Sequence, residues 1–229
     1  MTVSHTRAVA ATLLATAVLT ACGGTNPGAV QAAPQPVSGG PAVPSGVAKA
    51  RADSARYPYT AADVHFMSGM IGHHAQAIVM SRLVPTHGAS ASVRTLADRI
   101  INAQHDEIHT MQQWLGDRRQ PVPEAKSGPM KMMMNGMEHE MLMPGMLTDD
   151  QMKQLDLARG AEFDRRFLTF MIQHHRGAVS MVKQLFGSYG AAQDETVFKF
   201  ANDVNVDQST EIARMEKMLD ALGAEGRTR

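Results

Sequence analysis

The chain has 229 residues, which is enough for one ordinary domain with tails. Its 22 acidic and 22 basic residues balance, so no bulk charge favours a nucleic-acid partner. Cys22 is the single cysteine, which excludes an intramolecular disulfide bond.

Residues 1–21 have the features of a secretory signal peptide. Arg7 provides a weakly positive start, and the apolar run from Ala8 to Leu19 is too short to span a membrane. The sequence Leu-Thr-Ala-Cys that ends at Cys22 resembles a bacterial lipobox, in which the cysteine is lipidated and becomes the mature N-terminus. We therefore expect an exported protein that is lipid-anchored to the bacterial cell membrane and faces outside the cytoplasm. A plain signal peptide with a chance cysteine is the alternative.

Residues 22–57 follow as a tether that begins with the lipidated cysteine. They are rich in Gly, Pro, Ala, Ser and Gln and have almost no large apolar side chains. Such a segment cannot bury enough apolar surface to offset the entropy of ordering, so we expect a flexible linker. The folded domain is expected to span residues 58–222, and residues 223–229 form a polar tail.

The first helix is predicted to begin at a capping box formed by Thr60 and Asp63 and to end near Val84, before Pro85. Its apolar residues recur with the helical period of 3.6 residues. The adjacent pair His73 and His74 lies on these stripes, or at their edge. Both histidines are therefore expected on the buried face of the helix.

The second helix is predicted to start at a cap on Ser90 or Ser92 and to end near Leu115, which completes a first hairpin over residues 58–116. Gln104 belongs to both apolar stripes, so it points inward, and Glu107 sits at the edge of one stripe. Inward polar groups need partners, and a histidine of the facing helix is the natural one.

Residues 117–147 connect two halves of the chain. Glycines and prolines in this connection argue against a regular core helix, and no strand-like alternation is apparent there or elsewhere. Methionine usually fills cores, but this cluster could equally be a soft-metal capture or interaction segment. Its members are Met130, Met132, Met133, Met134, Met137, His139, Met141, Met143 and Met146.

The second hairpin is predicted over residues 148–222. A capping box at Thr148 and Gln151 starts a helix that bends at Gly160 and ends near Phe186. Asp194 is expected to cap the last helix, which runs to about Leu222.

The two hairpins repeat one pattern. Gln104-x-x-Glu107 is echoed by Gln208-x-x-Glu211, and the pair His73–His74 by His174–His175. The aligned residues further include Asp63 with Asp164, Phe66 with Phe167, Met70 with Met171, Ala77 with Ala178, and Met80 with Met181. Internal repetition of this kind sets the architecture, because one hairpin alone cannot bury its inward face. The predicted fold is an all-α, ferritin-like four-helix bundle made of two repeated helical hairpins.

The repeated residues are suited to a transition metal. Imidazole suits copper, zinc, iron and nickel, whereas thioether selects Cu(I). Methionine stands three and four residues before the two histidines of each pair, so one helical turn presents both donor types. Glu107 and Glu211 could be ligands or could accept the imidazole N–H. The candidate metal-site residues are His73, His74, His174, His175, Met70, Met171, Glu107 and Glu211.

Two alternatives accompany this metal hypothesis. The histidines could instead form a buried hydrogen-bond network with Glu and Gln that sets the register of the bundle. His105 and His109 also have a ligand-like spacing of four residues, but they fall outside the repeat, which favours a solvated face.

The paired motifs resemble the signature of the bacterial family catalogued as domain of unknown function 305. They read Met70-Ile-Gly-His-His-x-x-Ala-Ile-x-Met80 and Met171-Ile-x-His-His-x-Gly-Ala-Val-x-Met181, and the resemblance spans about Pro58 to Leu222. It implies a ferritin-like bundle, an exported or lipid-anchored location and, in some members, copper binding linked to copper tolerance. It implies no agreed reaction.

Three functions follow from these observations. The first is an envelope-anchored protein that binds or buffers copper, or another transition metal, in metal tolerance. The second is a ferritin-like redox enzyme, although Glu107 and Glu211 lack the histidine three residues on that such two-metal sites use. The third is a metal-free scaffold lipoprotein. No catalytic residue and no nucleic-acid partner are expected, and an envelope protein or a second copy remains open as partner.

Overall fold

The computed structural model of the protein describes residues 59–134 and 137–225. These residues fall within one compact unit, Val43–Arg229. The predicted signal peptide, the predicted lipidation site Cys22 and the predicted tether lie outside the described residues, as does the end of the polar tail.

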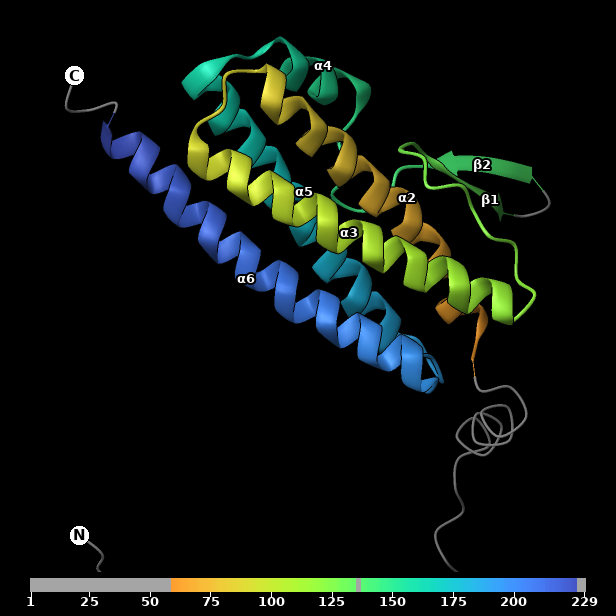
Figure 1. Ribbon diagram of the computed structural model, residues 1–229. Coiled ribbons are helices and arrows are strands. Elements are labelled where there is room, and N and C mark those ends of the chain that lie inside the picture. Colours follow the sequence, from red (N-terminus) through yellow and green to blue (C-terminus); the bar gives the residue numbers. More distant parts are fainter. Residues whose placement is uncertain (1–58, 135–136, 226–229) are drawn as a thin grey trace, which may run out of the picture. The chain divides into compact units, whose positions relative to one another are not determined.

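Four long helices form the predicted all-α bundle (Figure 1). They are α2 (Ala61–Leu83), α3 (Ala91–Asp117), α5 (Gly160–Gly187) and α6 (Glu195–Glu225). Helix α2 packs along α3, α5 packs along α6, and the two hairpins meet through α2 and α5. Within the described part of the chain, no helix combines the length and apolar character needed to cross a bilayer.

The helices begin where the local sequence predicts. Thr60 caps α2 in a reciprocal box with Asp63, and Ser90 caps α3 by accepting from the backbone of Val93. Asp194 accepts hydrogen bonds at 3.0 and 3.2 Å from the first backbone N–H groups of α6. Each cap satisfies donors that the first helical turn leaves free.

The predicted single helix after Thr148 is wrong in one respect, because the chain breaks rather than bends. The short helix α4 (Asp149–Leu157) ends first, and α5 starts anew at Gly160. Ala158 and Arg159 are extended, with ψ of 151° and 153°, and Gly160 has a left-handed φ of +57°. The backbone N–H of Gly160 then donates to the carbonyl of His87 at 2.8 Å, which ties the break to the turn after α2.

A small β-hairpin corrects the expectation that no strand would form. Strands β1 (Met130–Met134) and β2 (Met137–Met141) pair antiparallel, with Lys131 opposite Glu140. The Lys131 ammonium lies 2.7 Å from Glu138 and 3.8 Å from Glu140, so cross-strand charges support the pairing. The five residues of β2 do alternate between Met or His and Glu, which is a real but short strand signal.

The first residue of each repeat ties the two hairpins together. Asp63 of α2 accepts a hydrogen bond at 2.7 Å from the backbone N–H of Ala192, in the loop between α5 and α6. Asp164 of α5 accepts one at 3.1 Å from the backbone N–H of Ser90, in the loop between α2 and α3. Both carboxylates are buried, so each hairpin satisfies a loop of the other.

Residues 143–147, called here the crossover segment, are fixed between α2 and α5. The Gln76 side chain accepts from the backbone N–H of Leu147 at 2.6 Å and donates to its carbonyl at 3.0 Å. Gly145 has a φ of +79° and lies close to Gly177 of α5. A Cβ added to Gly177 would lie 2.6 Å from the Cα of Gly145. Glycine at both positions therefore lets the segment lie directly on α5.

Candidate metal centre

The two predicted histidine pairs meet at the contact between α2 and α5. All four side chains are fully buried. The rings of His73 and His174, which occupy equivalent positions in the repeat, have centroids 3.8 Å apart and planes tilted by 38°. The ring centroid of His74 lies 6.3 Å from that of His73, and the ring centroid of His175 lies 6.2 Å from that of His174. The repeat therefore brings four imidazoles into one buried group.

Each outer histidine of this group faces the predicted glutamate of its own hairpin. His74 Nε2 lies 2.6 Å from Glu107 Oε2, and His175 Nε2 lies 2.7 Å from Glu211 Oε2. The second contact is a well-aligned hydrogen bond, whereas the first is close but out of line. Both glutamates keep part of their side chain exposed, so they join the buried imidazoles to the surface.

The predicted pairing of Gln104 with a histidine is wrong. Gln104 is buried as expected, but its Oε1 has no hydrogen-bond partner among the described residues, and the same holds for Gln208. In each hairpin the glutamate three residues further along, and not the glutamine, is the side chain that lies against the outer histidine. Both glutamines line a space between α3 and α6.

The hydrogen bonds define which imidazole nitrogens are free. His73 Nε2 donates to the Pro144 carbonyl at 3.0 Å, and His175 Nε2 donates to Glu211. Because a carbonyl and a carboxylate can only accept, Nε2 carries a proton, and in the neutral form of each ring Nδ1 keeps its lone pair. Both Nδ1 atoms are buried without a partner in the described structure.

Burial keeps the inner histidines neutral. The pKa of His73 is lowered from 6.5 to about 3, mainly by burial and then by His74, against an opposing effect of the Pro144 hydrogen bond. The pKa of His174 is also lowered well below its ordinary value, by burial first and then by His73. Neutral imidazole is the form that binds metal, so at neutral pH these rings need lose no proton first.

The predicted thioether ligands are buried but divided. Met70 and Met171 are both inaccessible to solvent, yet they belong to two different hydrophobic clusters. Across residues 59–134 and 137–225, no three His, Cys, Asp or Glu side chains converge as a ready-made metal site. The four imidazoles and the two glutamates thus lie around the α2–α5 contact, whereas the two thioethers are separated, and the described residues form no complete coordination sphere.

A group of thioethers that includes one unpredicted member lies over Gly69 of α2. A Cβ at Gly69 would lie 2.8 Å from Met143 Sδ, 3.5 Å from Met130 Sδ and 3.5 Å from Met181 Cε. The repeat aligns Met181 with the core residue Met80, so the sequence offers no reason to single it out. The absence of a side chain at Gly69 is the feature that leaves room for these three methionines, called here the thioether cluster.

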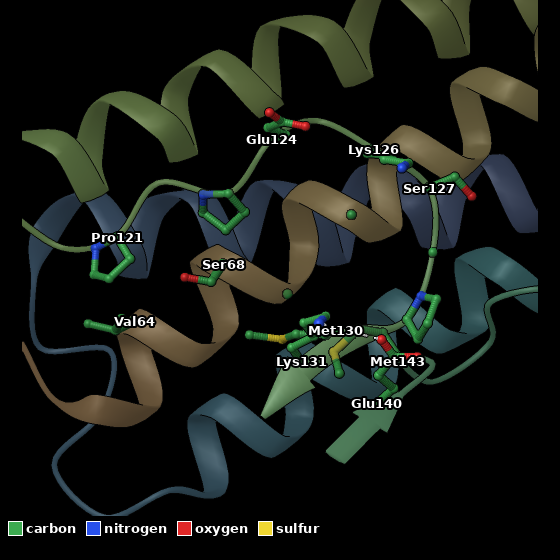
Figure 2. Close-up of a pocket in the computed structure, with 15 residues that line it drawn as sticks. Val64, Ser68, Pro121, Glu124, Lys126, Ser127, Met130, Lys131, Glu140 and Met143 are labelled. Atoms are coloured by element: carbon green, nitrogen blue, oxygen red, sulfur yellow. Dashed lines mark ion pairs between the residues drawn. The ribbon is translucent and has the colours of Figure 1, made fainter. Parts of the chain in front are cut away.

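A cavity opens beside the thioether cluster. Its volume is about 670 Å³, and it lies between α2 and the chain from Pro121 to Lys131 (Figure 2). Met130 and Met143 line it together with the ion pair of Lys131 and Glu140. The cavity therefore borders two of the three members of the thioether cluster, Met130 and Met143.

The predicted methionine-rich segment divides into two parts. Met137, His139 and Met141 are exposed on the β-hairpin, and the strand register sets Met132 opposite His139. Met143 and Met146 are instead buried in the core, and Met130 at the start of β1 packs partly against it. His105 and His109 are exposed on α3, as the solvated-face interpretation predicts.

The sequence profile of the family described as Domain of unknown function (DUF305) matches residues 63–219. The chain belongs to the DUF305 family. The matched range covers the eight predicted metal-site residues and the methionine-rich segment, and it leaves Cys22 outside. A comparison with curated proteins finds no match.

Solved structures, two of them of DUF305 proteins, share this fold. A Streptomyces coelicolor DUF305 protein described as secreted is 32% identical over 71% of this chain and 94% of its own, with a TM-score of 0.60. A DUF305 fragment from Deinococcus radiodurans is 28% identical over 71% of this chain and 98% of its own, with a TM-score of 0.59. CopM in its Cu(II)-bound form is 27% identical over 69% of this chain and 96% of its own, with a TM-score of 0.54. These likenesses confirm the ferritin-like helical fold of this DUF305 chain.

Proposed function

We propose that this DUF305 protein binds copper outside the cytoplasm and buffers it in metal tolerance. The observation that carries the proposal is the state of His73 and His175, whose Nδ1 lone pairs are buried and unpartnered while Nε2 donates to a carbonyl or a carboxylate. Metal-binding histidines characteristically donate their other N–H to such an acceptor, which fixes the ring and its tautomer. CopM, which has the same fold, has been solved with Cu(I), Cu(II) and silver.

The donor types suggest a division between two groups. The four imidazoles can hold copper in either oxidation state, whereas the thioether cluster favours Cu(I). Met143 of that cluster directly precedes Pro144, whose carbonyl accepts from His73 at 3.0 Å. The crossover segment therefore connects the two donor groups within one short stretch of chain. The exposed methionines of the β-hairpin would supply weaker, exchangeable contacts for capture.

The decisive test compares wild type with His73→Ala/His174→Ala in thermal unfolding with and without copper. A ligand at 100 times its Kd stabilises the folded state by about 2.7 kcal/mol, so copper should raise the wild-type midpoint by several degrees. The double variant should lose most of this increase. The matched control is His105→Ala/His109→Ala, which removes two exposed histidines of α3 and should keep the full increase.

An equal copper-induced increase in the His73/His174 variant would show that these histidines are not its ligands and would favour a structural network or a scaffold. If the variant is unstable without metal, Met143→Leu/Met181→Leu provides a second measurement. It nearly conserves core volume but removes two thioethers, so Cu(I) affinity should fall while the metal-free midpoint changes little. Unchanged Cu(I) affinity would exclude the thioether cluster as a site.

We further propose that the protein is exported and held on the membrane through lipid on Cys22. This rests on the lipobox-like sequence and on the fold shared with a Streptomyces coelicolor protein described as secreted. Cys22→Ala should move the protein from the membrane fraction to the soluble fraction or leave it with an uncleaved signal peptide. Unchanged membrane retention together with an unchanged mass would refute the anchor.

A further inference from the structure

A second cavity, of about 270 Å³, lies between α3 and α6, the two outer helices of the hairpins. These helices do not pack closely against one another, in contrast to α2 with α3 and α5 with α6. Gln104 and Glu107 line the cavity from α3, and Asp207, Gln208 and Glu211 line it from α6. The repeat thus places equivalent glutamines and equivalent glutamates on opposite walls.

The two glutamines have acceptors that no group in the described protein satisfies. Each side chain is only 3% exposed, and Oε1 of each is buried without a hydrogen bond. A buried acceptor left unpaired typically costs about 1–3 kcal/mol, so two at facing positions indicate a missing donor or cation. Because both residues line the same cavity, one occupant could satisfy both oxygens.

The charge around the cavity is predominantly negative. Glu107, Asp207 and Glu211 contribute three carboxylates, and Arg99 is the one basic residue of the described lining. The pKa of Asp207 is raised, first by partial burial and then by Glu107, Asp203 and Glu211. Asp207 has no counterpart in the first hairpin, where the aligned residue is Ala103, so this acid is an addition to the repeated pattern.

We propose that this cavity binds a hydrated divalent cation of the hard, oxygen-preferring class. The acidic and amide side chains that line the cavity offer carboxylate and amide oxygens, which are the ligand set of Mg²⁺, Mn²⁺ and Ca²⁺. No three described carboxylates converge at direct coordination distance, so the ion keeps several of its waters, as Mg²⁺ and Mn²⁺ commonly do. At about 30 Å³ per water molecule, the cavity has room for a six-water shell.

This site differs from the copper proposal in position and in chemistry. The cation would sit on the solvent side of Glu107 and Glu211, whose other contacts are His74 and His175. It would neutralise the crowded carboxylates and satisfy the two amide oxygens without using an imidazole or a thioether. The inference therefore stands whether or not the histidines hold copper.

The test uses Mn²⁺ as the probe, added to the metal-free full chain and followed by the loss of the free Mn²⁺ signal in electron paramagnetic resonance. Wild type should show one saturable site. Asp207→Asn should weaken Mn²⁺ binding about tenfold, which corresponds to about 1.4 kcal/mol. Gln104→Leu/Gln208→Leu should weaken it similarly without lowering the unfolding midpoint, because the unpaired acceptors are removed together.

Asp203→Asn is the matched control. Asp203 is an exposed acid one turn earlier on α6, it pairs with Lys199 at 2.6 Å, and it does not line the cavity. Its replacement should change Mn²⁺ affinity less than twofold. Equal weakening in Asp203→Asn and Asp207→Asn would mean that Mn²⁺ responds only to the overall surface charge, which would overturn the proposal. The absence of saturable binding at millimolar Mn²⁺ would overturn it as well. If the glutamine variant fails to fold, the two aspartate variants decide, because both replace exposed side chains.

Discussion

Gly177→Ala is expected to destabilise the bundle by about 3 kcal/mol, at the upper end of what overpacking a core costs. A Cβ at this position would overlap the Pro144 carbonyl oxygen and lie 2.6 Å from Cα of Gly145. These are backbone atoms, so no side-chain rotation can relieve the clash, and the crossover segment must move off α5. For a domain of this size the thermal midpoint should fall by roughly 6–12 °C.

Gly187→Ala is the control for this prediction. Gly187 is the last residue of the same helix, and a Cβ there would meet no atom within 4 Å. Alanine also has the higher helix propensity, so the midpoint should stay unchanged or rise slightly. Thermal unfolding followed by circular dichroism measures both variants. A midpoint for Gly177→Ala equal to that of Gly187→Ala would show that the crossover segment does not rest on α5 in solution.

Mild acid is expected to destabilise the metal-free protein, because the inner histidines resist protonation in the folded state. The folded state lowers the pKa of His73 to about 3, and that of His174 also lies well below 6.5. At a pH between the folded-state pKa values and 6.5, the unfolded chain therefore binds more protons than the folded protein. The stabilisation is therefore complete above about pH 6.5, the unfolded value, and is lost as the pH falls toward the folded values. Each histidine contributes a slope of up to about 1.4 kcal/mol per pH unit within this window.

Urea denaturation of the metal-free protein between pH 7.5 and pH 4.5 measures this slope. The slope should be smaller in His73→Gln/His174→Gln, because neither replacement titrates in this range. Replacing the exposed His109 of α3 with glutamine should leave the slope as it is in wild type. A free energy of unfolding that stays constant down to pH 4.5 would mean that the inner histidines already bind protons in the folded state.

The sequence predicts the parts of the structure that depend on local chemistry and on repetition. Capping at Thr60, Ser90 and Asp194 follows from hydrogen bonds within one helical turn. The meeting of His73 with His174 follows from the repeat, because equivalent buried faces must pack against one another. The same reasoning brings Glu107 and Glu211 to the imidazoles of their own hairpins.

The parts that the sequence does not predict depend on contacts between distant segments. Gln76 and Gly177 occupy equivalent positions of the repeat, but they contact the crossover segment in different ways. The Gln76 side chain hydrogen-bonds to it, whereas Gly177 lets its backbone come close because glycine has no side chain. Local patterns contain no information on which side of the bundle the connection crosses. The thioether cluster is hidden for the same reason, since Met130, Met143 and Met181 come from three separate parts of the chain.

The exchange of hydrogen bonds by Asp63 and Asp164 bears on how such a chain could arise. Each carboxylate holds a loop of the opposite hairpin, so residue i of one half contacts residue j of the other, and the reverse contact also exists. This is the contact rule of a two-fold symmetric homodimer. Two copies of one ancestral hairpin could make the same bonds between separate chains, and duplication with fusion would convert that dimer into a single polypeptide. The joining segment can cross on only one side, so it is the place where the two halves became free to diverge.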